Sequence, residues 1–220
     1  MQVVYADAPQ LSVRPDFPIN LTKLYINGEW RDSASRKTFA AIDPTTEEEI
    51  AQLAEGTVED VEAAVQAAET AFETGAWSQL SGHERGEILW KVGDLFRKYG
   101  EEFAFLQAKE MGRLFRDSMS VDIPHLANMF HYYAGWASKI EGAVKQTTKG
   151  LHTYTLREPL GVVAAITPFN FPLILSISKF APALAAGNNR VRVEGCPSSL
   201  PSEPCVTISN HTAQALLQAS

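Results

Sequence analysis

The sequence lacks the features of a secreted, membrane or nucleic-acid-binding protein. Its two cysteines are too few for a disulfide framework, so a reducing, cytoplasmic location is expected. With 19 basic and 26 acidic residues the net charge is −7, which argues against nucleic acid or an anionic membrane as a partner. No apolar run reaches the roughly 20 residues that span a bilayer. The N-terminus has no basic, cleavable pattern, and Asp7 and Asp16 argue against a transit peptide.

Metal-ligand spacing is also missing. The five histidines are His83, His125, His131, His152 and His211. His125 and His131 are too far apart to share a helix face as an i, i+4 pair would, so no metal site is expected. Cys196 and Cys205 have no base or helix terminus nearby in sequence that would lower the thiol pKa, and both are interpreted as unreactive.

What is present is the composition of an ordinary globular protein, with 45% hydrophobic, 10% aromatic and 20% charged residues. Its 220 residues suffice for one large domain or two small ones. Residues 1–20 show no periodicity and are interpreted as an extended arm. The Asn27-Gly28 pair, flanked by apolar and aromatic residues, predicts a hairpin with a type I′ turn. Short strands are predicted at Thr38–Ile42 and 50–53.

Capping signals predict the helices that follow. Thr57 before Asp60, and Ser81 before Glu84, have the spacing of capping boxes, and Gly75 is expected to end the first of these helices. A longer helix is predicted over about 121–140, with these apolar residues on one face: Ile123, Ala127, Phe130 and Ala134. Residues 145–157 are rich in threonine around Lys149-Gly150, which predicts a polar β-hairpin that, from the residues alone, is a solvated surface feature.

One stretch has the pattern of a strand, a tight connection and a helix. Residues 162–166 form an unbroken apolar run, which predicts a strand buried on both faces, as in a parallel sheet. Thr167 and Pro168 are expected to end it, and Pro172 suits the first position of the next helix. Ligands of open α/β sheets lie beyond the carboxyl ends of such strands. Asn170 falls at that point.

Two segments of this region resemble the start of the cofactor domain of the NAD(P)-dependent aldehyde dehydrogenase superfamily: Pro159-Leu-Gly-Val-Val-Ala-Ala-Ile-Thr-Pro-Phe-Asn-Phe-Pro172 and Pro182-Ala-Leu-Ala-Ala-Gly-Asn188. The resemblance implies that Asn170 donates a side-chain N–H to the substrate oxyanion, a role that suits a fixed neutral amide. It also implies that backbone at Ile166, Thr167, Pro168 and Phe169 lies along the cofactor, NAD or NADP. Earlier signposts of the family occur in the expected order, in Leu24-Tyr-Ile-Asn-Gly-Glu-Trp30, Ala54-Glu-Gly56, Ala76-Trp-Ser78, Glu84-Arg85 and Tyr133-Ala-Gly-Trp136.

On this resemblance the fold is α/β, the N-terminal part of an aldehyde-dehydrogenase-like fold with a helical layer and an incomplete Rossmann-like parallel sheet. The expected division is an N-terminal arm (1–20), small strands and helices of the cofactor-binding domain (21–144), an oligomerisation-type β-hairpin (145–157), the first strand, elbow and helix of the dinucleotide-binding sheet (158–188), and a divergent tail compatible with disorder (189–220). The aromatic residues of the long helix are expected to be mostly core, with one or two facing the aldehyde channel: Phe130, Tyr132, Tyr133 and Trp136.

The resemblance is expected to stop near Asn188. The family continues into a second buried strand that ends in Lys-Pro, whereas Arg190 and Arg192 are expected to interrupt that strand here, with Val193 where the lysine belongs. The family's glycine-rich turn, its glutamate base and its Gly-Gln-x-Cys nucleophile do not occur in these 220 residues. One hypothesis is a reading-frame shift near residue 189, since a Glu codon followed by a Gly codon reads Lys or Arg in a shifted frame.

The predicted function is therefore that of the N-terminal part of an aldehyde dehydrogenase, which oxidises aldehydes to carboxylates with NAD or NADP. Alone, the chain is expected to be inactive for want of the nucleophile. The alternative is a non-catalytic fragment that associates with full-length subunits, or forms a homo-oligomer, through the 145–157 hairpin. A third hypothesis is a misread gene with an unstable product, because half a parallel sheet leaves an open edge and exposed apolar faces.

Overall fold

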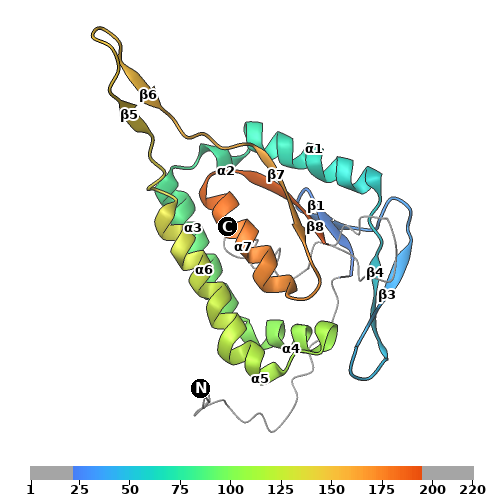
Figure 1. The fold of residues 1–220 in the computed structure, drawn as a ribbon. Coiled ribbons are helices and arrows are strands. Elements are labelled where there is room, and N and C mark those ends of the chain that lie inside the picture. The colour runs from blue at the N-terminus through green and yellow to red at the C-terminus, as the bar shows by residue number, and fades with distance from the viewer. Residues whose placement is uncertain (1–21, 195–220) are drawn as a thin grey trace.

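The computed structural model describes residues 22–194, and for the last six of these only the backbone. Its centre is a pair of parallel strands between helices (Figure 1). The predicted arm at 1–20 and the tail beyond residue 194 lie outside the described residues.

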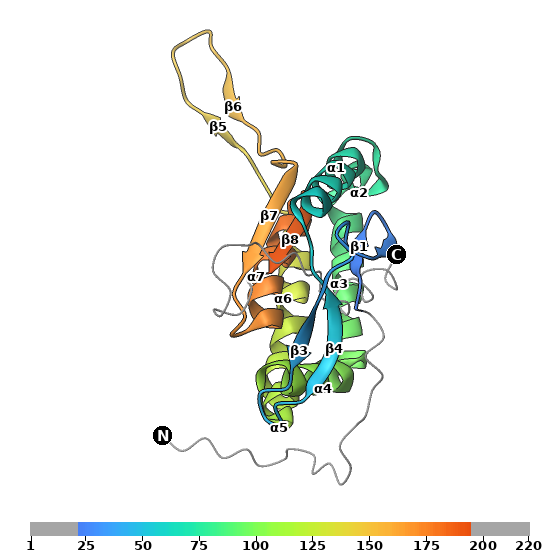
Figure 2. The ribbon, with the colours of Figure 1, turned by 90° about the vertical axis from the view of Figure 1, so that its right-hand side faces the viewer.

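A helical layer forms one side of the molecule. Helices α3 (Gly82–Lys98) and α6 (Ile123–Trp136) run side by side, and α7 (Pro172–Ala185) packs against α6, while α4 (Gly100–Met111) lies near one end of this layer (Figures 1 and 2). The helices pack because each presents a stripe of apolar residues at helical spacing.

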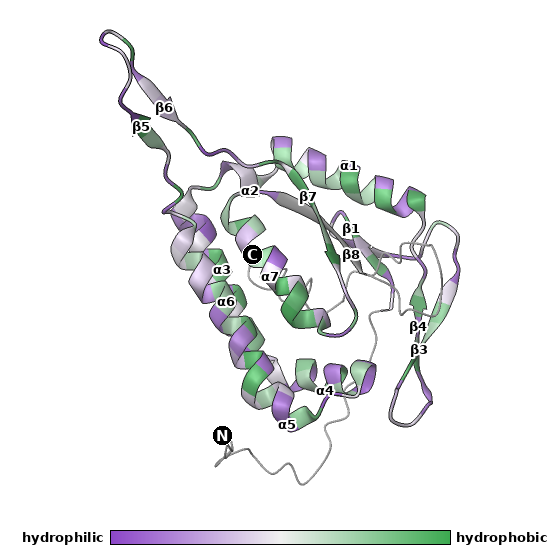
Figure 3. Ribbon diagram, in the orientation of Figure 1, coloured by the Kyte–Doolittle hydropathy of each residue, from purple (hydrophilic) through white to green (hydrophobic). Residues whose placement is uncertain are grey.

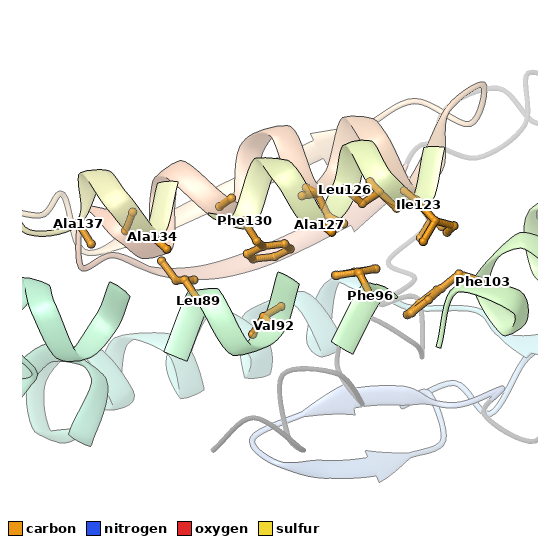
Figure 4. Close-up of a cluster of buried hydrophobic side chains, with 14 of the residues drawn as sticks. Leu89, Val92, Phe96, Phe103, Ile123, Leu126, Ala127, Phe130, Ala134 and Ala137 are labelled. Carbon is orange, nitrogen blue, oxygen red and sulfur yellow. The ribbon is translucent and has the colours of Figure 1, made fainter. Parts of the chain in front are cut away.

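The core between these helices is built around stacked phenylalanines (Figure 4). The ring of Phe96 lies 4.7 Å from that of Phe103 and 5.6 Å from that of Phe130, centroid to centroid. Leu89 and Leu126 are fully buried beside them. The predicted apolar face of the long helix is confirmed, since Ile123, Ala127, Phe130 and Ala134 are all buried.

The long helix itself begins differently from the prediction over 121–140. A short helix, α5 (Phe115–Asp117), continues into a π-helical turn, η1 (Ser118–Asp122), before α6 begins. Another short helix, α2 (Ala76–Gln79), lies between α1 and α3. A π-turn inserts one extra residue into a helix and so rotates the residues on either side relative to one another. Spacing along the sequence does not reveal it.

Local signals near the N-terminus are confirmed. Strands β1 (Leu24–Ile26) and β2 (Glu29–Arg31) pair antiparallel, and their turn places Asn27 and Gly28 at φ of 54° and 80°. These positive values are those of the type I′ turn that favours Asn-Gly.

The second hairpin joins β3 (Thr38–Ile42) to β4 (Glu49–Ala54), with a register shift near Ala41. Lys109 of α4 holds its turn through a 3.1 Å contact with the Asp43 carboxylate.

Both predicted capping boxes are present. Thr57 and Asp60 cap α1 (Val58–Thr74), which ends at Gly75 as expected, and Ser81 and Glu84 cap α3. In each box the hydroxyl accepts from a backbone N–H while the carboxylate accepts from the cap residue's own N–H. These local bonds place α1 and α3 where the sequence indicates.

The predicted polar hairpin projects away from the body in both ribbon views (Figures 1 and 2). Its strands are β5 (Ala143–Lys145) and β6 (Thr153–Thr155), so it starts slightly before residue 145. It is not uniformly polar, because these large apolar side chains on or beside it are at least 59% exposed: Val144, Leu151, Tyr154 and Leu156.

The parallel sheet consists of β7 (Val162–Thr167) and β8 (Asn189–Glu194). Helix α1 lies on one side of the pair and α7 on the other (Figure 1). In Figure 3, β7 is coloured hydrophobic along much of its length, whereas α1 alternates between hydrophilic and hydrophobic bands. The predicted α/β architecture is therefore observed, with a two-stranded parallel sheet in the described residues.

The expectation that β7 is buried on both faces is wrong within the described part of the chain. Ala165 and Thr167 are 3% and 1% exposed, but Ile166, which points to the opposite face, is 66% exposed. Val162, at the start of β7, packs beside Ala64 of α1, so α1 covers only the beginning of that face. The carboxyl end of β7 consequently presents open apolar surface.

The expectation that Arg190 and Arg192 interrupt the second strand is also wrong. β8 pairs with β7 without a break, from Val162 opposite Asn189 to Thr167 opposite Glu194. A parallel ladder is made by backbone groups, and alternating Arg and Val have the two-residue period of a strand. The first six residues of the expected tail at 189–220 therefore belong to the sheet.

Candidate functional site

The candidate site is the elbow between β7 and α7, formed by residues 168–171. Pro172 occupies the first turn of α7, as predicted, and Phe171 is the residue that precedes the helix, with φ −145° and ψ 68°. Asn170 is exposed there, and its side chain makes no hydrogen bond to another described residue. The amide is therefore available to a ligand.

The four residues predicted to contact the cofactor differ in exposure. Ile166 and Phe169 are 66% and 57% exposed, and Pro168 is exposed as well. Thr167 points to the covered face at 1% exposed, where its hydroxyl has no hydrogen-bond partner among the described atoms. Side chains of Ile166, Pro168 and Phe169 can thus line an apolar ligand surface, whereas Thr167 can reach such a ligand only through its backbone.

Side-chain hydrogen bonds of Asn188 hold the start of β7 to the end of α7, at the end of this strand–elbow–helix unit opposite to the elbow. Asn188 accepts a hydrogen bond from the N–H of Gly161, just before β7, and donates to the carbonyl of Ala183 in α7, each at 3.1 Å. Arg85 of α3 donates to the carbonyls of Leu80 and Ala185. Partial burial lowers the pKa of Arg85 from its ordinary value.

An ion pair lies at the other end of α7, beside the elbow. Arg113 follows α4 and pairs through two nitrogens with the carboxylate of Asp122, the Nη2–Oδ1 distance being 2.8 Å. The guanidinium carbon lies 5.4 Å from the ring centroid of Phe171. Sequence reasoning missed both charged residues, because the π-turn that presents Asp122 has no pattern of its own.

The aromatic residues of α6 divide between core and surface, so the expectation that they are mostly core is not confirmed. Phe130 is fully buried, whereas Tyr132 and Trp136 are 60% and 48% exposed. Tyr133 is partly buried against the core. Whether any of them lines a substrate channel stays a prediction.

Neither a cluster of metal ligands nor a membrane-spanning helix is found in residues 22–194. No three His, Cys, Asp or Glu side chains in this part of the chain gather as metal ligands would. Within the same residues, no helix has the length and apolar character needed to cross a membrane.

The fold and the elbow together define a class, the N-terminal portion of an α/β dinucleotide-binding fold. Residues 30–193 match the model of the aldehyde dehydrogenase family. The match continues past Asn188, where the resemblance is expected to stop. The chain belongs to the aldehyde dehydrogenase family.

Individual relatives agree with this assignment. Aldehyde dehydrogenase family 2 member B4, mitochondrial, from Arabidopsis thaliana is 44% identical over 179 residues, which cover 81% of this chain and 33% of that protein. Human aldehyde dehydrogenase 1A1 is 41% identical over 177 residues, or 80% of this chain and 35% of the relative. The chain thus spans about a third of the length of these curated relatives.

Solved structures show the same correspondence in three dimensions. PnpE in complex with nicotinamide adenine dinucleotide superimposes with a TM-score of 0.82 at 36% identity, covering 91% of this chain and 39% of that one. An NAD+ complex of aldehyde dehydrogenase from Bacillus cereus gives 0.81 at 35% identity, covering 91% and 39%. The partial α/β fold is therefore that of an aldehyde dehydrogenase.

Proposed function

We propose that this chain supplies the oxyanion-binding elbow of an NAD(P)-dependent aldehyde dehydrogenase. The observation that carries the proposal is Asn170, exposed beyond the carboxyl end of β7 with an amide that no described group engages. When a nucleophile adds to an aldehyde, the carbonyl oxygen becomes an alkoxide. An amide N–H held at that oxygen lowers the energy of the transition state.

The elbow fits part of a dinucleotide. The exposed side chains of Ile166 and Phe169 offer apolar surface for a flat ring, and strand ends of this kind are the usual cofactor position in open α/β sheets. None of the four residues at 166–169 is charged, so none of their side chains can form an ion pair with the pyrophosphate. Bound there, NAD or NADP would accept the hydride.

We further propose that the 220 residues alone do not oxidise aldehydes. Neither Cys196 nor Cys205 has the Gly-Gln-x-Cys surroundings of the family's nucleophile, and without a thiolate no covalent adduct can form. Aldehyde-dependent formation of reduced cofactor by the purified chain would contradict this.

The role of Asn170 can be tested in a chimera. Residues 22–188 of this chain replace the matching part of an intact relative, and reduction of NAD is followed at saturating aldehyde. Loss of one oxyanion donor lowers kcat by about 10²- to 10³-fold. The kcat of the Asn170→Ala chimera is therefore expected to fall by that factor. Asn128→Ala is the matched control, because Asn128 is another exposed asparagine. It lies in α6 and accepts a 2.9 Å hydrogen bond from Arg97 of α3. Equal activity in the two variants would overturn the proposal.

The second candidate function is association with other subunits through the projecting hairpin. Its exposed apolar residues, Val144, Leu151, Tyr154 and Leu156, favour a buried contact, since isolated large apolar side chains on a protruding ribbon gain by leaving water. Light scattering after gel filtration tests it, comparing the chain with a Val144→Ser, Tyr154→Ser double variant. A monomer mass for the unaltered chain, alone and with an intact relative, would rule this function out.

A cytoplasmic location is also proposed, on the low cysteine count. A relative with a mitochondrial name makes fractionation of cells that express a tagged chain the direct test.

A further inference from the structure

The elbow that carries Asn170 has no capping side chain. Phe171 precedes α7 but offers no side-chain bond to the helix, and Pro172 has no N–H to donate. The conformation of the elbow must therefore be held by contacts from other elements.

The contact that the structure provides is the ring of Phe171 against Arg113. The guanidinium carbon lies 5.4 Å from the ring centroid, within the roughly 6 Å over which a cation is attracted to an aromatic face. Phe171 is 36% exposed, so neighbouring apolar side chains do not enclose it fully. The guanidinium covers the ring next to Asn170.

Asp122 fixes the guanidinium in that position. Its side chain is 1% exposed. Its two carboxylate oxygens accept hydrogen bonds from Nε and Nη2 of Arg113. A bidentate ion pair fixes the orientation of the guanidinium plane as well as the position of its charge. Asp122 reaches it because the π-turn at Ser118–Asp122 ends just before α6, and such turns recur at functional sites.

We propose that Arg113 is a positioning residue for the oxyanion donor, acting through Phe171, with Asp122 fixing its guanidinium. The inference rests on the proposed function, since only an oxyanion donor needs its amide held in one place. The chain of contacts runs from the π-turn through Asp122 and Arg113 to Phe171, whose backbone follows directly from Asn170.

The test uses the 220-residue chain labelled with ¹⁵N-asparagine, without aldehyde or cofactor. The side-chain amide signals of Asn170 are assigned by their loss in Asn170→Ser. Phe171→Leu removes the aromatic face and is expected to shift or broaden those signals. It is also expected to speed hydrogen exchange over residues 171–176 by roughly two- to five-fold, the range for a partly exposed cation–π contact. Phe171→Tyr keeps the face and is expected to match the original chain.

Arg113→Met is expected to act as Phe171→Leu does. Its matched control is Arg116→Met, because the Arg116 side chain is 56% exposed and lies 3.4 Å from the carboxylate of its neighbour Asp117. This variant is expected to leave the Asn170 signals in place. If Arg113→Met does not fold, because it leaves Asp122 buried without its partner, the two Phe171 variants decide the matter.

Two results would overturn the proposal: unchanged Asn170 signals in Phe171→Leu, or equal disturbance by Phe171→Tyr and Phe171→Leu. Neither result bears on whether Asn170 binds an oxyanion, which the chimera tests. Conversely, full activity of the Asn170→Ala chimera defeats the proposed function whatever these signals show.

Discussion

Asn188 accepts a 3.1 Å hydrogen bond from the backbone N–H of Gly161, and so ties the end of α7 to the start of β7. The same side chain donates to the Ala183 carbonyl, and Asn188 is 6% exposed. One buried amide therefore closes the strand–elbow–helix unit at the end opposite to Asn170.

Asn188→Ala is expected to lower the free energy of unfolding by about 1–3 kcal/mol. It leaves the buried N–H of Gly161 without a partner, which costs about that much, whereas the Ala183 carbonyl still accepts a 3.0 Å bond from the Asn188 backbone N–H. Urea denaturation measures the change. Asn128→Ala is the control, since Asn128 is exposed, and it is expected to stay within about 0.5 kcal/mol. Similar losses for both would show that Asn188 does not close the unit.

Asp60 makes stability depend on acid pH. Burial raises the pKa of its carboxyl, but hydrogen bonds from Thr57 and from the Ala34 N–H outweigh burial, and the net pKa lies below the ordinary 3.8. A folded-state pKa below the unfolded value adds stability above about pH 3.8 that is lost as the pH falls through the folded pKa.

Asp60→Asn is therefore expected to destabilise the chain at pH 7 and to flatten the fall in stability below about pH 4. Thermal unfolding between pH 2.5 and 7 checks this. Asp94→Asn is the control, because the Asp94 side chain is 57% exposed. An unchanged acid slope in Asp60→Asn would contradict the assignment.

Phe130→Ala is expected to cost about 3–5 kcal/mol in the free energy of unfolding, because a fully buried aromatic ring leaves a cavity. The neighbouring Tyr132 is 60% exposed, and Tyr132→Ala is expected to cost less than about 1 kcal/mol. The two changes remove similar volumes from one helix, so chemical denaturation isolates the effect of burial. A small loss in Phe130→Ala would mean that the Phe130 ring is not closely packed in the core.

Two glycine substitutions are expected to act with opposite signs. Gly187 has φ +84°, and an added Cβ would lie 3.1 Å from Pro159 Cγ and 3.4 Å from Arg85 Cζ. Gly187→Ala is therefore expected to destabilise by about 1–2 kcal/mol. Gly135 lies within α6, where an added Cβ meets nothing closer than Lys139 Nζ at 3.9 Å.

Gly135→Ala is accordingly expected to stabilise by up to about 1 kcal/mol through helix propensity. Melting temperatures of the two variants check the signs. Stabilisation by Gly187→Ala would show that the junction between α7 and β7 is looser than the contacts indicate.

Much of the local structure could be predicted from the sequence, because it depends on interactions between neighbouring residues. The Asn27-Gly28 turn and the Thr57–Asp60 box depend on residues a few positions apart, so short-range hydrogen bonding and φ preferences decide them. The place of Asn170 also followed from sequence, since a strand, a proline and a helix in succession put the intervening residue at the end of a parallel strand.

Other features depend on what packs against each element. The exposed face of Ile166 could not be inferred from an apolar run, because the run is the same whether or not another element covers it. β8 forms despite Arg190 and Arg192, since a neighbouring strand offers backbone partners that no residue pattern records.

The sequence by itself determined the helix caps, the hairpin turns and the position of Asn170, because each depends on groups that are near neighbours along the chain. Only the tertiary structure brought Arg113 and Asp122 to Phe171. Residues from α4's end, a π-turn and the elbow meet there through the packing of α6 against α7, and such long-range contacts follow from the way whole helices fit together.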